Sequence, residues 1–129
     1  MKSITLLCID DDPDDIELLR EAIETINPNV CCHCVNSGKH GLELLNSISP
    51  EFIFLDINMP VMDGHETLQA IRANYAFNEI PICILSTTVR HTDKEALLKM
   101  GANYCIQKAT TFAELCSRLK SVFRVRAPQ

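Results

Sequence analysis

The sequence predicts an α/β fold in which a parallel sheet of five strands is covered by helices on both faces. Short apolar runs of β type alternate along the chain with longer amphipathic segments of helical period. The connections between them are short, and this alternation is typical of parallel strands joined by crossover helices. A length of 129 residues and a hydrophobic content of 47% suit a single domain of this kind.

Five short runs rich in Ile, Leu, Val, Phe and Cys are expected to form the strands. Their almost continuous apolar character is typical of strands buried on both faces of a parallel sheet. The runs are Ile4–Ile9, Val30–Val35, Phe52–Leu55, Ile82–Leu85 and Asn103–Gln107.

Five amphipathic segments between and after these runs are expected to form the helices. The first begins at Pro13, which suits an opening helical turn, and Asp12 before it can cap the free N–H groups. Apolar residues recur at helical spacing from there to Ile26. Gly101 is expected to end the fourth helix. The other helices are predicted at Gly38–Asn46, Gly64–Asn74, Thr92–Met100 and Thr110–Val125.

Composition argues against two classes of protein. The net charge of −5 argues against a nucleic-acid-binding protein, which normally carries a basic patch. The longest N-terminal apolar run, Ile4–Ile9, is too short for a signal peptide or a membrane span. We therefore expect a soluble cytoplasmic protein with no membrane partner.

The seven cysteines are expected to be reduced side chains that pack in the interior. Their number is odd and the sequence has no secretion signal, which argues against a disulfide framework. Cys31 and Cys34 have the C-x-x-C spacing of some metal sites. On a strand, however, these two side chains would point to opposite faces, and no second C-x-x-C completes a zinc site.

Polar and charged residues stand directly after four of the five predicted strands. Asp10 and Asp11 follow the first strand and Asp56 follows the third. Ser86 begins the segment after the fourth strand, and Lys108 follows the fifth. Ligands of α/β proteins bind beyond the carboxyl ends of the strands, so we expect these side chains to meet in one crevice.

The residue types at these strand ends indicate phosphoryl transfer. Three carboxylates close together repel one another unless a cation lies among them, and Mg²⁺ prefers such oxygen ligands. Lys108 can offer a point charge to a phosphate oxygen, and Ser86 a hydroxyl donor. Asp56 is then the carboxylate that can act as nucleophile and form an aspartyl-phosphate.

In order and spacing these residues resemble the receiver domains of two-component response regulators, in particular the stand-alone chemotaxis regulators. The resemblance spans essentially the whole chain, and its most specific part is the stretch from Leu55 to Gly64. It implies a flavodoxin-like, doubly wound sheet of order 2-1-3-4-5 flanked by five helices. It also implies one receiver domain over residues 1–129 without an output domain. The segments that carry it are Ile9–Pro13, Phe54–Gly64, Leu85–Thr87 and Lys108.

The resemblance also implies a role for each residue of the site. Asp56 would be the phosphoacceptor, and Ser86 the switch hydroxyl that moves toward the phosphoryl group. Lys108 would be the ion-pair partner of that group. The Mg²⁺ ligands would be Asp10, Asp11, Asp56 and the backbone carbonyl of Asn58. Asn58 and Thr88 would tune the lifetime of the phosphoryl group.

The implied partners are proteins. A histidine kinase or a histidine phosphotransfer protein would supply the phosphoryl group, and an unidentified downstream protein would receive the signal. A homodimer through the face of the fourth helix, fifth strand and fifth helix is a further expectation. The chain would catalyse only its own phosphorylation and dephosphorylation, so it would not be an enzyme acting on external substrates.

Two positions depart from the usual receiver pattern. Cys105 stands where most receivers have an aromatic switch residue, and Tyr104 lies one position earlier, on the opposite side of a strand. Ala109 stands where a cis proline usually follows the lysine. Either the Lys108–Ala109 bond is trans and Lys108 is placed differently, or the bond is cis at a cost of about 2.5–4 kcal/mol.

Two other functions remain open at this point. Cys105 and Ala109 are compatible with a degenerate receiver, an interaction module that works without phosphorylation. An Asp-nucleophile phosphohydrolase is also conceivable from the strand ends. Such enzymes use a second carboxylate two positions after the nucleophile as acid and base, and this chain has Asn58 there.

Overall fold

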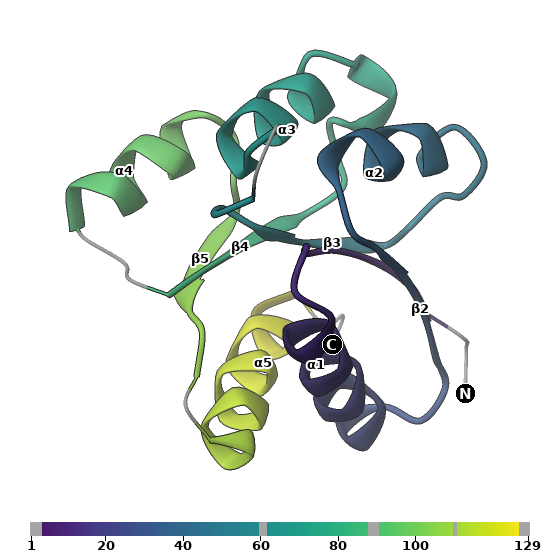
Figure 1. The fold of residues 1–129 in the computed structure, drawn as a ribbon, viewed down its shortest axis with the longest axis vertical. Helices are drawn as coiled ribbons and strands as arrows, with labels where there is room; N and C mark the ends of the chain where they lie inside the picture. Colours follow the sequence, from purple (N-terminus) through teal and green to yellow (C-terminus); the bar gives the residue numbers. More distant parts are fainter. Residues whose placement is uncertain (1–3, 60–61, 88–90, 110, 127–129) are drawn as a thin grey trace.

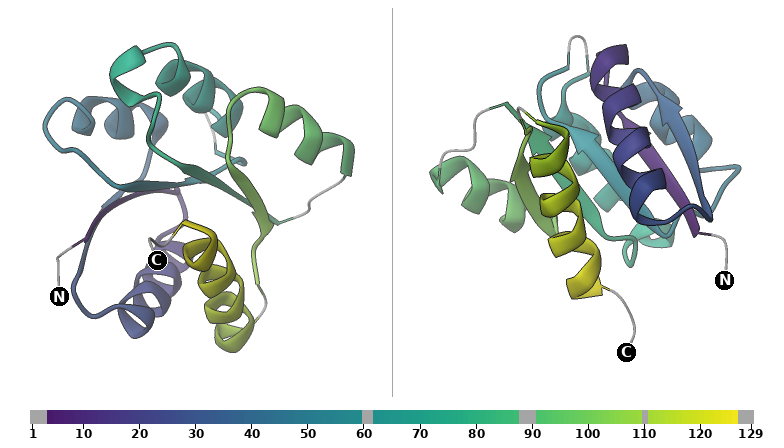
Figure 2. Two further views of the ribbon diagram at one scale, coloured as in Figure 1. Left: turned by 180° about the vertical axis from the view of Figure 1, so that it is seen from behind. Right: turned by 90° about the horizontal axis from the view of Figure 1, so that it is seen from below.

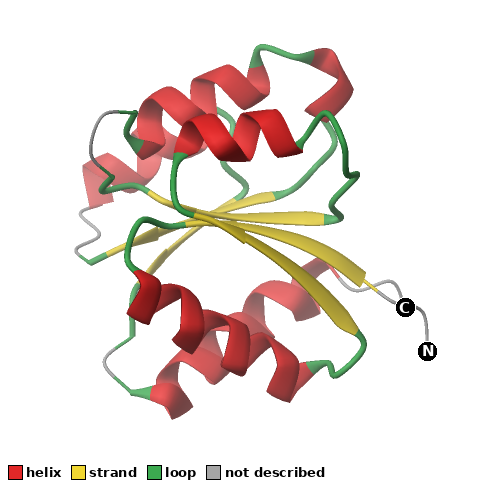
Figure 3. Ribbon diagram, turned by 45° about the vertical axis from the view of Figure 1, so that its right-hand side comes forward, coloured by secondary structure: helices red, strands yellow, loops and turns green. Residues whose placement is uncertain are grey.

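The computed structural model describes residues 4–59, 62–87, 91–109 and 111–126 of the chain. A central sheet lies between two layers of helices (Figures 1 and 3). Its neighbouring strands all pair in parallel, in the order β2-β1-β3-β4-β5. The predicted fold class and strand order are therefore confirmed. The strands are β1 (Ile4–Ile9), β2 (Val30–Val35), β3 (Phe52–Asp56), β4 (Ile82–Ser86) and β5 (Tyr104–Gln107).

The helices divide between the two faces of the sheet. Helices α1 and α5 lie side by side on one face, and α2, α3 and α4 cover the other (Figures 1 and 2). A 3₁₀ turn, η1, follows α3 and was not predicted. The segments are α1 (Pro13–Ile26), α2 (Gly38–Leu44), α3 (Gly64–Arg72), η1 (Tyr75–Phe77), α4 (His91–Lys99) and α5 (Phe112–Arg126). Among the described residues, no helix is long and apolar enough to span a membrane.

Alternate side chains of the strands build two separate apolar clusters. Leu7 and Ile53 point to the α2–α3–α4 side and pack with Leu68. Leu6 and Phe54 point to the α1–α5 side. This alternation is the period-two geometry of a strand, and it explains why the central runs are apolar at almost every position. The expectation that all five strands are buried on both faces is wrong for β2 and β5, because these strands form the edges of the sheet and remain partly exposed.

The helix starts near the carboxyl edge follow the sequence signals. The Asp12 carboxylate accepts hydrogen bonds from the backbone N–H groups of Asp14 and Asp15, as predicted for the cap of α1. At α3 the Asp63 side chain and Glu66 form a reciprocal capping box. These caps fix the direction in which both helices leave the strand ends.

Element boundaries differ from the predictions by a few residues. Strands β3 and β4 are each one residue longer, so that Asp56 and Ser86 close the strands instead of following them. Helix α3 ends at Arg72, whose side chain turns toward the following loops. Gly101 has a φ of +112° just after α4, which is the left-handed conformation expected of a glycine after a helix.

Candidate functional site

An acidic cluster lies at the carboxyl edge of the sheet. Oxygen atoms of Asp10, Asp11 and Asp56 all lie within 4.8 Å of one another. Asp10 and Asp56 are buried, each 2% exposed, whereas Asp11 is open to solvent. The adjacency of β1 and β3 produces this arrangement, because both strands end at the same edge. The three carboxylates expected to converge are therefore close together.

Burial makes the charge on Asp56 costly. Desolvation raises the pKa of Asp56 to about 6, and the neighbouring Asp10 charge acts in the same direction. The backbone N–H of Asn58, which donates to Oδ1 of Asp56 over 3.1 Å, and the Lys108 ammonium lower the pKa but do not cancel the effect of burial. Any cation that binds beside Asp56 therefore favours the ionised form of its side chain.

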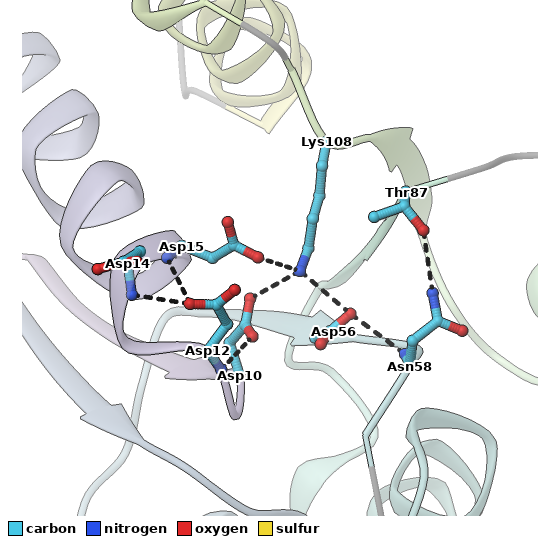
Figure 4. A network of polar contacts seen from close by, with 8 residues as sticks. All are labelled: Asp10, Asp12, Asp14, Asp15, Asp56, Asn58, Thr87 and Lys108. Atoms are coloured by element: carbon cyan, nitrogen blue, oxygen red, sulfur yellow. Dashed lines mark hydrogen bonds and ion pairs between the residues drawn. The ribbon is translucent and has the colours of Figure 1, made fainter.

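Lys108 enters the same site from the end of β5. Its ammonium nitrogen lies 3.1 Å from Oδ2 of Asp10, 3.4 Å from Oδ1 of Asp56 and 2.7 Å from Oδ2 of Asp15 (Figure 4). Burial alone would lower the pKa of Lys108, but the Asp15 hydrogen bond and the Asp10 and Asp56 charges raise it overall. The ammonium is therefore charged and held among carboxylates.

The backbone at Lys108 shows which isomer the Lys108–Ala109 peptide bond adopts. The described residues contain no cis peptide bond, so the Lys108–Ala109 bond is trans. The backbone N–H of Lys108 donates to the carbonyl of Ser86 over 2.7 Å, which ties β5 to β4 at the site. A trans bond thus still brings the lysine side chain to within 3.4 Å of Asp56.

The polar residues after β3 and at the end of β4 lie beside the acidic cluster. Ser86 is the last residue of β4 and is 6% exposed. The Asn58 amide donates to the Thr87 hydroxyl over 3.5 Å, which bridges the ends of β3 and β4 (Figure 4). Thr88, the second position expected to tune the phosphoryl lifetime, lies outside the described residues.

The position of the missing aromatic switch residue is occupied by a small buried thiol. Cys105 borders a cavity of about 170 Å³ that Ser86 and Asn58 also line. Tyr104 does not fill it, because its ring packs on the other face of the sheet, stacked 6.0 Å from Phe52. The predicted opposite orientation of Tyr104 is confirmed, and the space beside Ser86 carries no aromatic ring from β5.

The loop between β3 and α3 passes close to the acidic cluster because α3 begins with glycine. A Cβ on Gly64 would lie 2.4 Å from the Cα of Ile57 and 2.6 Å from the carbonyl oxygen of Asp56. Contacts this short cannot be relieved by rotating a side chain, since both atoms belong to the backbone. Gly64 therefore allows the close approach that holds the end of β3 in place.

Two of the three cysteines of β2 pack against the interior, as the sequence predicts. Cys32 and Cys34 pack with the buried Cys8 on the α1 side of the sheet, whereas Cys31 is exposed and contacts His33. Within the described ranges, the acidic trio is the one group of three or more such side chains whose ligand atoms converge. Cys31 and Cys34, the two residues of the C-x-x-C spacing, thus have different surroundings, as the alternation of a strand predicts.

Sequence reasoning missed one residue of the site. The sequence predicts no role for Asp15, yet its side chain is only partly exposed and makes the shortest ion pair of Lys108. The two residues are 93 positions apart in the chain. The only sequence signal was the position of Asp15 in the first turn of a helix that follows an acidic strand end.

The chain belongs to the family of response regulator receiver domains, whose family pattern matches residues 6–120. This assignment establishes it as a receiver of the kind found in two-component systems, and the family is a signalling phosphoacceptor family. The fold and the convergence of acidic strand ends with a lysine agree with that membership.

Individual relatives agree with the family assignment. The transcriptional regulatory protein PrrA of Mycobacterium tuberculosis is 35% identical over 124 residues, which cover 94% of this chain and 50% of PrrA. The chain thus spans about half the length of the first curated relatives it matches.

Solved structures share the fold. The phosphorylated cyanobacterial phytochrome response regulator RcpA superposes with a TM-score of 0.86 at 24% identity, covering 99% of this chain and 98% of RcpA. The Mn²⁺-bound form of response regulator Rcp1 gives 0.80 at 24% identity, covering 93% of this chain and 91% of Rcp1.

Proposed function

We propose that this receiver accepts a phosphoryl group on Asp56 in a Mg²⁺-dependent reaction and thereby changes its protein partners. The observation that carries the proposal is the acidic trio, with Asp56 buried in it and the Lys108 ammonium 3.4 Å away. Positioning and charge neutralisation are the main requirements of phosphoryl transfer, and this group of side chains can meet both.

The donor set suits a hard divalent cation. Carboxylate oxygens within 4.8 Å of one another can share one ion, and Mg²⁺ is commonly held by one or two carboxylates with water and phosphate oxygens. Asp10, Asp11 and Asp56 would hold it, with the backbone carbonyl of Asn58 as a further ligand. When bound, the ion supplies positive charge to the carboxylates and to the phosphoryl oxygens. Support comes from the fold relative Rcp1, whose structure is Mn²⁺-bound.

The protein's own residues carry out the transfer. A carboxylate oxygen of Asp56 attacks the phosphorus of a phosphohistidine, the bond from phosphorus to the histidine nitrogen breaks, and an aspartyl-phosphate forms. Lys108 offers an N–H to a phosphoryl oxygen, and Ser86 a hydroxyl. The donor would be a histidine kinase or a histidine phosphotransfer protein.

The change of partners would follow from the charge added at Asp56. A phosphoryl group that draws in Ser86 and Lys108 favours one of two forms of the face that α4 presents. The cavity between Ser86 and Cys105 gives the Ser86 side chain room to move without the rotation of an aromatic ring from β5. The face formed by α4, β5 and α5 is the surface we propose for the downstream protein or a second receiver.

The chemistry of this site also bears on the two alternatives. A phosphohydrolase would need an acid–base group beside Asp56, and the nearby Asn58 amide is bonded to Thr87 and cannot exchange a proton in this way. A degenerate interaction module has no need for a charged lysine among buried carboxylates, an arrangement that is costly to maintain. We therefore favour the phosphoacceptor.

The test is intact-protein mass spectrometry after incubation with acetyl phosphate, with and without Mg²⁺. We expect the mass of one phosphoryl group to be added only when Mg²⁺ is present. The matched control is Asp56→Asn, which keeps the size of the side chain and should gain no mass. A wild-type protein that is folded by circular dichroism yet gains nothing would overturn the proposal in favour of the interaction module.

A further inference from the structure

Lys108 makes its shortest contact outside the acidic trio. Its ammonium nitrogen is 2.7 Å from Asp15 but 3.4 Å from Asp56 (Figure 4). Asp15 reaches it from the first turn of α1, on the side of Lys108 away from Asn58. The lysine expected to serve Asp56 is therefore held more closely by a carboxylate on a different element.

The surroundings leave Lys108 few other partners on that side. A cavity of about 30 Å³ lies between α1, α5 and the strand ends, and Asp10, Asp15, Lys108 and Ala109 line it with apolar side chains. This is room for roughly one or two water molecules. The ammonium has three N–H groups, and the three carboxylates Asp10, Asp15 and Asp56 all lie within 3.4 Å of its nitrogen.

Asp15 differs from the other two partners because it lies outside the proposed metal site. The converging trio consists of Asp10, Asp11 and Asp56, so a bound cation would neutralise two of the three partners of Lys108. Asp15 would keep its full charge. Its side chain is 38% exposed and its backbone N–H is bonded to the Asp12 cap, so it stays at the same place on the helix start.

We infer that Asp15 is a positioning residue that competes with the phosphoryl group on Asp56 for the Lys108 ammonium. This inference rests on the proposed function. A phosphoryl oxygen must draw Lys108 away from Asp15, and the free energy of the Asp15–Lys108 pair opposes that movement. Asp15 therefore lowers the steady-state level of phosphorylated protein and shortens the lifetime of the aspartyl-phosphate.

The experiment compares wild type with Asp15→Asn and with Asp14→Asn as the matched control. Asp14 is in the same helical turn and carries the same charge, but the contacts of Lys108 do not include it. With acetyl phosphate and Mg²⁺, we measure the rate constants of phosphoryl gain and loss by intact mass. Asp15→Asn should raise the ratio of gain to loss by about threefold, the effect of a partly exposed ion pair, and Asp14→Asn should leave it near the wild-type value.

A second pair of variants tests whether the effect passes through Lys108. In a Lys108→Ala background, Asp15→Asn should no longer change the ratio, since the group for which both partners compete is gone. An unchanged or lower ratio in Asp15→Asn overturns the inference, as does an equal effect with and without Lys108. These outcomes require phosphoryl gain by wild type. A wild type that gains none refutes the proposed function instead, and the competition with it.

Discussion

Each end of the sheet holds a partly buried cationic side chain. The one at the amino end contacts neutral oxygen atoms, and the one at the carboxyl end contacts carboxylates. At the amino ends of β4 and β5, Arg72 donates to the carbonyl oxygens of Gly101, Phe77 and Ile80 at 2.7–2.9 Å and to the Asn103 side chain at 3.0 Å. At the carboxyl ends, Lys108 faces three carboxylates. One cation satisfies neutral acceptors, and the other stands in an excess of negative charge.

The two sets of partners indicate different roles for Arg72 and Lys108. The acceptors around Arg72 are neutral dipoles that a single guanidinium can satisfy with its N–H groups, so none of them needs a further cation. At the carboxyl end, three carboxylates contact the Lys108 ammonium, and Asp11 adds a fourth carboxylate beside Asp10 and Asp56. Such an excess of negative charge is unfavourable by itself and favours any positive charge that binds there. The contacts of Arg72 hold loops together at the amino end, and the carboxyl end is the place where we propose that a cation binds.

Replacing Arg72 should produce the largest effect. Arg72→Met keeps much of the side-chain stem but leaves several partly buried acceptors without their donor, so we expect a loss of about 3 kcal/mol in the free energy of unfolding. Urea unfolding measures it. The Mg²⁺ affinity, determined by calorimetry in the native range, should stay within twofold of wild type, because Arg72 lies at the other end of the sheet. A large loss of Mg²⁺ affinity would contradict this separation of the two ends.

The next effect is the pH dependence of Mg²⁺ binding. Asp56 has a pKa of about 6 in the metal-free protein, so protons compete with the cation at lower pH. Affinity should be level above pH 7 and about tenfold weaker at pH 5, one unit below that pKa. Isothermal titration at several pH values measures it. Asp56→Asn should remove this component of the pH dependence, and an affinity that is level from pH 7.5 to pH 5 would contradict the proposed role of Asp56 as a ligand.

The smallest effect concerns stability without metal. Because the folded-state pKa of Asp56 is raised, its charge destabilises the folded state increasingly from about pH 4 to about pH 6, and the full penalty applies above that. Asp56→Asn should therefore be more stable than wild type by at least about 1 kcal/mol at pH 7.5 in EDTA, because the neutral amide avoids the desolvation of a charge. Urea unfolding tests this, and saturating Mg²⁺ should reverse the order. A variant less stable than wild type in EDTA would show that the ion pair with Lys108 outweighs desolvation.

Local sequence signals determined the strands, most helix starts and the acidic trio. Asp12 and Gly101 mark helix ends through backbone geometry that depends on near neighbours. The trio could be predicted because parallel strands bring their carboxyl ends to one edge, so Asp10 and Asp56 need only follow apolar runs. Membership of the receiver family adds the strand order, which no local pattern contains.

Only the tertiary structure decided which side chains share a cation. The Asp15–Lys108 pair depends on where the first turn of α1 lies relative to the end of β5, and the Arg72 contacts depend on the path of the loops around η1. The edge positions of β2 and β5 also follow from the order of the assembled sheet. Sequence periodicity encodes the face of an element that is buried. The distance between two side chains on different elements is set by packing of the whole domain.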